Sequence, residues 1–299
     1  MVSCLVAAEY PIYGRFGCGV ATERVQLVID ATTTQFLPVV IDDDAEVGIA
    51  DPETWWAAAS AVYDEVRATR PGFAGIPERW WKVDAGLLPR PGDDPSGARL
   101  ILLRRDERTV GFARYTVTDK WEHGRPRATC EVEGLLGVTA LDEARLWRFC
   151  CELDWVSSVT ADARVPSDSI RLFAVDARSV GERDRVDFTW VRLLSPAALA
   201  DRQYRSDGAL TIAVRDRQGL LPATIRLVVD DDGAATCEAT ATPPDIELDS
   251  GELGSLGMGG VSALQLAAAG RIVEHRSGSV DLAERLFRWP TTPWCFAAF

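Results

Sequence analysis

Strand-like and helical stretches follow one another in this chain without the regular strand–helix–strand succession that builds a purely parallel sheet. Three strand-like runs come in sequence at residues 100–103, 111–118 and 128–136, followed by a helical pattern at 141–153. A second hairpin succession occupies 210–214, 224–229 and 235–241, with helical stretches after it. Strands joined by short turns pair antiparallel, whereas parallel pairs need a long crossover. The order therefore predicts an α+β or mixed α/β fold.

The clearest helix start is Asp51, an N-capping aspartate followed by proline at the first helical position. This helix is expected to continue to Arg67. The first strand-like run, at 2–7, has no neighbouring run with which to pair, so we expect an unpaired strand with exposed edges. The 299 residues suffice for about two domains, and the composition changes at Ser195.

The charge balance restricts the ligands. A net charge of −13 argues against nucleic acid, because binding to phosphates needs basic stripes. An acidic surface attracts small cations, although it also serves solubility alone. No apolar run reaches the roughly 20 residues of a membrane helix, and the chain start lacks a basic signal-peptide region. We therefore expect no membrane partner and a cytoplasmic protein.

The seven cysteines show no paired spacing of the kind that binds zinc, and the chain has only two histidines, His123 and His275. The sequence therefore predicts no metal site. The cysteines are expected to be reduced and to behave as small apolar side chains in strands and cores.

Two stretches carry a family resemblance. Residues 12–22 read Ile-Tyr-Gly-Arg-Phe-Gly-Cys-Gly-Val-Ala-Thr, with three glycines in six positions, which indicates positive φ angles or close backbone approach. Residues 246–256 are followed by an alanine-rich helix, and the chain ends in phenylalanine. Both stretches, in this order, resemble the Eis (enhanced intracellular survival) family of acetyltransferases. One position departs from the family pattern: Cys18 stands where a tyrosine is usual.

The resemblance implies a GNAT-superfamily enzyme that moves acetyl from acetyl-CoA to primary amines of aminoglycoside-like polycations. It also implies homo-oligomers, as hexamers or trimers. Mapped onto this chain, residues 1–35 correspond to the end of the acetyl-CoA-binding GNAT domain. Residues 36–195 correspond to a second GNAT-like domain without cofactor, and residues 196–299 to a sterol-carrier-like domain.

The resemblance assigns catalysis to Tyr13 and to the terminal carboxylate of Phe299. A protonated amine is a poor nucleophile, so a carboxylate must first take its proton, and a phenol near the departing sulfur can return one. Arg15 is expected to hold the carboxylate or the cofactor through its forked donors. The alternative for Tyr13 is a core tyrosine on a glycine turn. The apolar tail at 294–299 could equally pack against a domain edge.

A substrate pocket is expected from aromatic and acidic side chains. Trp55, Trp56, Trp80 and Trp81 could bind an amine by cation–π contact, and Glu131 could attract a polycation. The alternative is that the tryptophan pairs face a core and the carboxylate is only solvated.

In this family the pyrophosphate of acetyl-CoA lies on the backbone amides of a helix N-terminus, in a segment Arg-x-x-Gly-x-Gly/Ala upstream of the Ile12 stretch. We therefore expect no such segment within this chain, and no acetyl-CoA bound by it alone. A different class of function stays open: a non-catalytic binding or oligomerisation module with a sterol-carrier-like ligand pocket.

Overall fold

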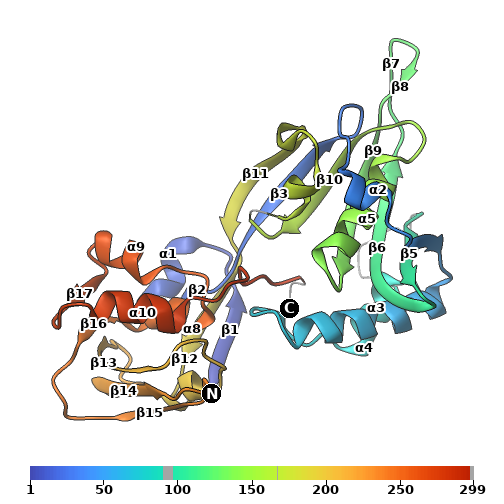
Figure 1. Ribbon diagram of the computed structural model, residues 1–299. Helices are drawn as coiled ribbons and strands as arrows, with labels where there is room; N and C mark the ends of the chain where they lie inside the picture. Colours follow the sequence, from blue (N-terminus) through green and yellow to red (C-terminus); the bar gives the residue numbers. More distant parts are fainter. Residues whose placement is uncertain (90–96, 167, 297–299) are drawn as a thin grey trace. The chain divides into compact units, whose positions relative to one another are not determined.

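The computed structural model describes residues 1–89, 97–166 and 168–296, so the terminal Phe299 lies outside the described residues. The chain forms two compact units (Figure 1). Arg24–Arg185 form the middle unit, and residues 1–23 join those from Val186 onward to form the terminal unit. The predicted domains 1–35, 36–195 and 196–299 are a different division and stay predictions.

The middle unit is built on a seven-stranded sheet with the strand order β11-β3-β10-β9-β6-β5-β4. Its strands are β3 (Glu23–Asp30), β4 (Glu46–Ile49), β5 (Arg99–Arg105), β6 (Arg108–Thr118), β9 (Ala128–Gly137), β10 (Val156–Arg164) and β11 (Val180–Asp187). Strands β4, β5, β6 and β9 pair antiparallel, and β9 pairs parallel with β10 after a helical crossover. This sheet confirms the predicted mixed α/β class.

Helices α3 (Pro52–Arg67) and α5 (Ala140–Cys151) begin directly after their N-capping residues, Asp51 and Thr139. The Asp51 carboxylate accepts the Thr54 amide at 3.0 Å, as the sequence predicts. Thr139 and Asp142 form a reciprocal capping box at the start of α5. The smaller elements of this unit are α2 (Pro38–Ile41), α4 (Glu78–Asp84), β7 (Trp121–Glu122), β8 (Arg125–Pro126), α6 (Ile170–Phe173) and η2 (Ala177–Ser179).

The terminal unit contains a three-stranded sheet, β1-β12-β2, and a five-stranded sheet, β15-β14-β13-β16-β17. The strands are β1 (Val2–Val6), β2 (Gly19–Val20), β12 (Thr189–Leu193), β13 (Gly208–Arg215), β14 (Thr224–Val229), β15 (Ala235–Ala239), β16 (Ile246–Asp249) and β17 (Ile272–Glu274). Its helices are α1 (Tyr10–Tyr13), η1 (Gly14–Phe16), α7 (Ala197–Ala200), α8 (Ser250–Met258), α9 (Ala263–Ala268) and α10 (Ser279–Phe287).

The expectation that the first strand lacks a partner is wrong. Strand β1 pairs antiparallel with β12 over five residues, from Val2 opposite Leu193 to Val6 opposite Thr189. The partner lies almost the whole chain away, so no pattern near the start could indicate it. The methionine carbonyl adds a further bond, accepting the Leu194 amide.

Two other local predictions differ from the structure. The sequence also favours Ser279 as the N-cap of the last helix, but Gly278 takes that position with φ 82° and Ser279 is the first helical residue. The sequence further predicts a helix over residues 261–271, but the helix found there, α9, ends before Gly270 at φ 73° and β17 follows. Within the described residues none of the helices could span a bilayer; the longest, α3, has 16 residues.

Candidate active site

The glycine-rich stretch forms a tight connection between α1 and β2. Gly17 has φ 75°, a left-handed conformation that other residues adopt only with strain, and its amide binds the Gly14 carbonyl at 3.0 Å. Gly19 is needed for a different reason: a Cβ there would overlap the Gly251 carbonyl on α8. Positive φ and close approach were both predicted from the glycine spacing, and both occur.

Tyr13 lies at the end of α1 beside a tryptophan of β12. The Tyr13 and Trp190 ring centroids are 6.1 Å apart, and Tyr10 packs edge-on against the same indole at 5.1 Å. The indole Nε1–H of Trp190 donates to Asp187 at 2.5 Å. Tyr13 is half-buried, so its ring is held in place while part of its surface stays accessible.

A buried arginine that the sequence analysis did not single out holds the glycine turn. Arg192 on β12 donates to the Gly17 carbonyl at 3.2 Å and makes two bonds of 2.7 Å to the Asp216 carboxylate. Burial raises the pKa of Asp216, but the Leu221 amide and the Arg192 guanidinium outweigh it, so the pKa lies below its ordinary value. The Asp216 carboxylate is therefore ionised at neutral pH, and its bonds to Arg192 hold the turn in place.

Arg15 and Cys18 are the other polar members of the turn. The Arg15 Nε donates to the Ile12 carbonyl at 3.1 Å, and its side chain is otherwise exposed. Burial raises the pKa of the Cys18 thiol, so at neutral pH this cysteine is a protonated thiol and a weak nucleophile. The role of Arg15 toward a cofactor stays a prediction.

The last described residues return to the terminal unit. The Trp289 amide binds the Gly259 carbonyl at 3.1 Å, and both Trp294 and Cys295 are fully buried. A Cβ at Gly260 would lie 3.0 Å from Pro293 and 3.7 Å from the Ala21 carbonyl, just after β2. The chain end and the glycine turn thus belong to one compact unit, while Phe299 itself lies outside the described residues.

The four tryptophans of the predicted substrate pocket all lie in the middle unit, with different exposure. Trp55 and Trp81 are buried, with ring centroids 6.3 Å apart, and both pack edge-on against Phe112. Trp80 is 50% exposed. Trp56 already carries a cation, the Lys82 ammonium 5.0 Å from its ring centroid. The packing of Trp55 and Trp81 is that of core side chains; substrate binding by the four stays a prediction.

We expect the Trp55→Ala variant to lose about 3–5 kcal/mol of unfolding free energy, the usual result of truncating a buried aromatic. Its indole N–H, which donates to the Ile101 and Ala113 carbonyls at 3.2 Å, would be lost as well. Trp80→Ala is the matched control and should change stability by less than about 0.5 kcal/mol. Urea denaturation followed by circular dichroism measures both. Equal stability of the two variants would contradict the core assignment.

Glu131 lies on β9, exposed, and accepts the Thr118 hydroxyl at 3.0 Å. The described contacts of the tryptophans run to α4, β5 and β6 instead. The described contacts therefore do not join Glu131 and the tryptophans in one cluster.

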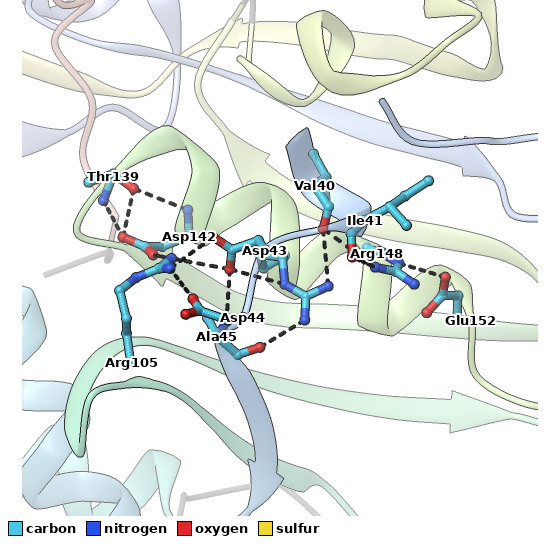
Figure 2. A network of polar contacts seen from close by, with 11 residues as sticks. Val40, Ile41, Asp43, Asp44, Ala45, Arg105, Thr139, Asp142, Arg148 and Glu152 are labelled. Atoms are coloured by element: carbon cyan, nitrogen blue, oxygen red, sulfur yellow. Dashed lines mark hydrogen bonds and ion pairs between the residues drawn. The ribbon is translucent and has the colours of Figure 1, made fainter. Parts of the chain in front are cut away.

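A polar network ties the segment between α2 and β4 to the start of α5 (Figure 2). Arg105 donates to Asp43 at 2.8 Å, to Asp44 at 2.9 Å and to Asp142 at 3.1 Å. The Asp43 and Asp142 carboxylates raise the pKa of Arg105. Arg148 donates to the Ile41 carbonyl at 3.1 Å and to Glu152 at 2.7 Å (Figure 2). The charged residues of this network are paired within it, so we interpret the network as one that stabilises the fold.

The N-terminus of α5 is a position in the middle unit where the phosphates of a cofactor could bind. Its first turn carries the buried carboxylates of Asp142 and Glu143. Asp142 accepts the Thr139 amide, and Glu143 accepts Arg164 Nη2 at 2.6 Å. Two carboxylates at this position repel an anion and already use the local donors. This helix N-terminus therefore does not fit the pyrophosphate of acetyl-CoA.

The expectation that the chain lacks the spacing Arg-x-x-Gly-x-Gly/Ala is wrong, because the spacing occurs once in the sequence. Arg108, Gly111 and Ala113 have this spacing. They lie inside strand β6, however, with Gly111 paired to Leu103 and Gly137, and Arg108 pairs with Glu65 at 2.5 Å. A strand interior offers no free amides to a phosphate. Within the described residues, no group of side chains could hold a metal ion either.

Comparison with known proteins agrees with this architecture. The acetyltransferase (GNAT) domain family matches residues 72–193, and the sterol carrier protein domain family matches residues 195–296. An uncharacterized N-acetyltransferase of Streptomyces avermitilis is 35% identical over 302 residues, covering 99% of this chain and 72% of the relative. N-acetyltransferase Eis of Mycobacterium tuberculosis is 31% identical over 291 residues, covering 95% and 68%. The crystal structure of Eis1 from Mycobacterium abscessus has a TM-score of 0.81 at 28% identity, covering 100% and 73%.

A GNAT domain followed by a sterol carrier domain defines the class of this protein as an acetyltransferase of the GNAT superfamily. Within that class, the chain belongs to the Eis-like N-acetyltransferases. Acetyl-CoA is the acetyl donor that the GNAT fold implies in general. The chain spans 68–73% of the length of these relatives, and the expected loss of a cofactor domain stays a prediction.

Proposed function

We propose that the protein transfers acetyl groups to primary amines of aminoglycoside-like polycations, with Tyr13 as proton donor and the terminal carboxylate of Phe299 as base. The observation that carries the proposal is the terminal unit itself. It contains the glycine turn with Tyr13 and the buried chain end, and Gly260 lies close to both Pro293 and Ala21. The Tyr13 O–H can give a proton to the departing thiolate, while the carboxylate takes one from the substrate ammonium.

The net charge of −13 supports a polycationic substrate, because an acidic protein draws cations toward it over long distances. Homo-oligomers, as hexamers or trimers, are part of the same proposal.

We further propose that residues 1–299 alone do not bind acetyl-CoA. The carboxylates of Asp142 and Glu143 at the start of α5 support this, as does the strand position of the Arg108–Ala113 spacing. Calorimetric titration of the chain with acetyl-CoA tests it, and micromolar binding would refute it.

The test of the catalytic roles uses a version lengthened upstream to the size of the relatives, with kanamycin as amine. Tyr13→Phe and deletion of Ala298 and Phe299 should each lower kcat by about 10²–10⁴-fold, the usual contribution of a positioned acid or base. Tyr10→Phe is the matched control, because Tyr10 packs on the same Trp190 ring. Unchanged turnover after either catalytic change would count against the assignment.

A further inference from the structure

The middle unit has an open polar groove of about 380 Å³ that lies outside the proposed active site. It lies on the strands β11, β3 and β10, which are neighbours at one end of the seven-stranded sheet (Figure 1). Its volume falls in the range of small-molecule sites. The groove is lined by three arginines and three serines: Arg127, Arg178, Arg183, Ser157, Ser158 and Ser179.

The pleat of the sheet explains why this face is polar. Leu27 and Ile29 of β3 are fully buried in the core that α5 covers. Because successive side chains of a strand point to opposite faces, Val28 and Asp30 point to the other face and line the groove. On β11 the same alternation buries Val180 and places Gly181 and Arg183 in the groove.

Several arginines of this unit are held in ion pairs by carboxylates. Arg105, Arg108, Arg148 and Arg164 are all engaged by carboxylates. Arg127, Arg178 and Arg183, in contrast, make no ion pair with any carboxylate among residues 1–89, 97–166 and 168–296. Three exposed guanidinium groups without an ion pair among the described residues therefore line one hollow.

One carboxylate, that of Asp30, also lines the groove. It is already satisfied locally, since it accepts the Thr32 hydroxyl at 2.6 Å and the Thr32 amide at 2.9 Å. Three guanidinium groups and this single carboxylate leave an excess of two positive charges. The hollow thus favours a ligand with at least two negative charges.

We infer that this groove binds a small phosphate-bearing anion. Guanidinium groups bind phosphate oxygens through two parallel N–H donors, and the serine hydroxyls supply further donors. Gly181 leaves room for the ligand, because a Cβ there would meet only the Val28 carbonyl, at 3.6 Å. The net charge of −13 disfavours binding of long polyanions, so we expect a small molecule rather than a nucleic acid.

The test is calorimetric titration of the chain with sodium pyrophosphate at constant ionic strength. The wild-type chain should bind one pyrophosphate in a saturable manner. The double variant Arg178→Gln/Arg183→Gln should weaken binding at least about tenfold. Gly181→Val should weaken it similarly with all charges kept, because its side chain occupies the hollow. Arg104→Gln removes an exposed arginine of β5 outside the groove and should leave binding unchanged.

A titration with ADP distinguishes the source of the phosphates. Tighter binding than pyrophosphate, with the same response to the variants, would indicate phosphates carried on a nucleotide smaller than acetyl-CoA, which the chain alone is proposed not to bind. Equal or weaker binding would indicate the free anion. Either result supports the inference. Absence of saturable pyrophosphate binding, or an equal loss in Arg104→Gln, would overturn it. So would a change of oligomeric state in the arginine variants without any effect on pyrophosphate binding, because these arginines would then belong to a subunit contact.

Discussion

The Arg164→Met variant is expected to lose about 3–5 kcal/mol of unfolding free energy, because it removes the nearest cationic partner of two buried carboxylates. Arg164 is 3% exposed and donates to Asp168 at 2.8 Å, to Glu143 at 2.6 Å and to the Leu135 carbonyl at 2.6 Å. Its guanidinium also lies 5.3 Å from the Trp147 ring centroid. Methionine fills much of the volume but replaces none of these bonds.

The loss should depend on pH in a definite direction. Burial raises the pKa of Glu143, and the Arg164 guanidinium opposes this rise. Without Arg164 the pKa of Glu143 in the folded protein rises further above its value in the unfolded chain. A carboxyl with a raised folded pKa favours folding when protonated, so this contribution is present at low pH and is lost as the pH rises. The variant should therefore lose more stability at pH 8 than at pH 5.

Urea denaturation at both pH values measures this prediction. The triple variant Arg164→Met/Glu143→Gln/Asp168→Asn should recover part of the loss, since it no longer buries unpaired charge. Arg171→Met is the matched control, because Arg171 contacts Glu182 at 4.0 Å in an exposed pair, and such pairs contribute about 0–1 kcal/mol. A loss in Arg164→Met no greater than in Arg171→Met would show that the buried network contributes nothing to stability.

The second large effect is expected for Gly19→Ala, with a loss of about 3 kcal/mol or more from overpacking. An added Cβ would overlap the Gly251 carbonyl and the Ser255 hydroxyl of α8, and the Gly251 carbonyl belongs to the helix backbone. The reciprocal approach is also close, since a Cβ at Gly251 would lie 2.8 Å from the Cys18 carbonyl. The backbones of the glycine turn and α8 therefore approach too closely to leave room for a methyl group.

Gly14→Ala provides the control from the same turn. Gly14 has φ −58°, and a Cβ there would meet no atom within 4 Å, so the change should be neutral or slightly stabilising. Thermal unfolding of both variants measures the difference. In a version that acetylates amines, Gly19→Ala should also lower turnover, because the turn positions Tyr13. Equal melting temperatures for the two variants would contradict the close packing.

The candidate site was only partly predictable. The spacing of three glycines indicated a constrained turn at Tyr13, and the structure confirms the positive φ of Gly17. Arg192 and Asp216, which hold that turn, had no signal, because a lone arginine in a strand and an aspartate in a loop are ordinary in any sequence. The groove arginines were missed for the same reason. Arg127 is far along the chain from Arg178 and Arg183, and only the tertiary structure brings them to one groove.

The sequence by itself determined the local elements. Asp51 and Pro52 begin α3, the alternating β3 buries one face, and Asp230–Gly233 turns β14 into β15, with Gly233 at φ 77°. Each depends on residues within a few positions, where capping, pleat and turn chemistry act directly. Only the tertiary structure decided the partner of β1, because two strands can pair whatever their separation along the chain. It also decided that Trp55 and Trp81 are buried while Trp80 is exposed, since burial is set by what packs against a side chain and not by its type.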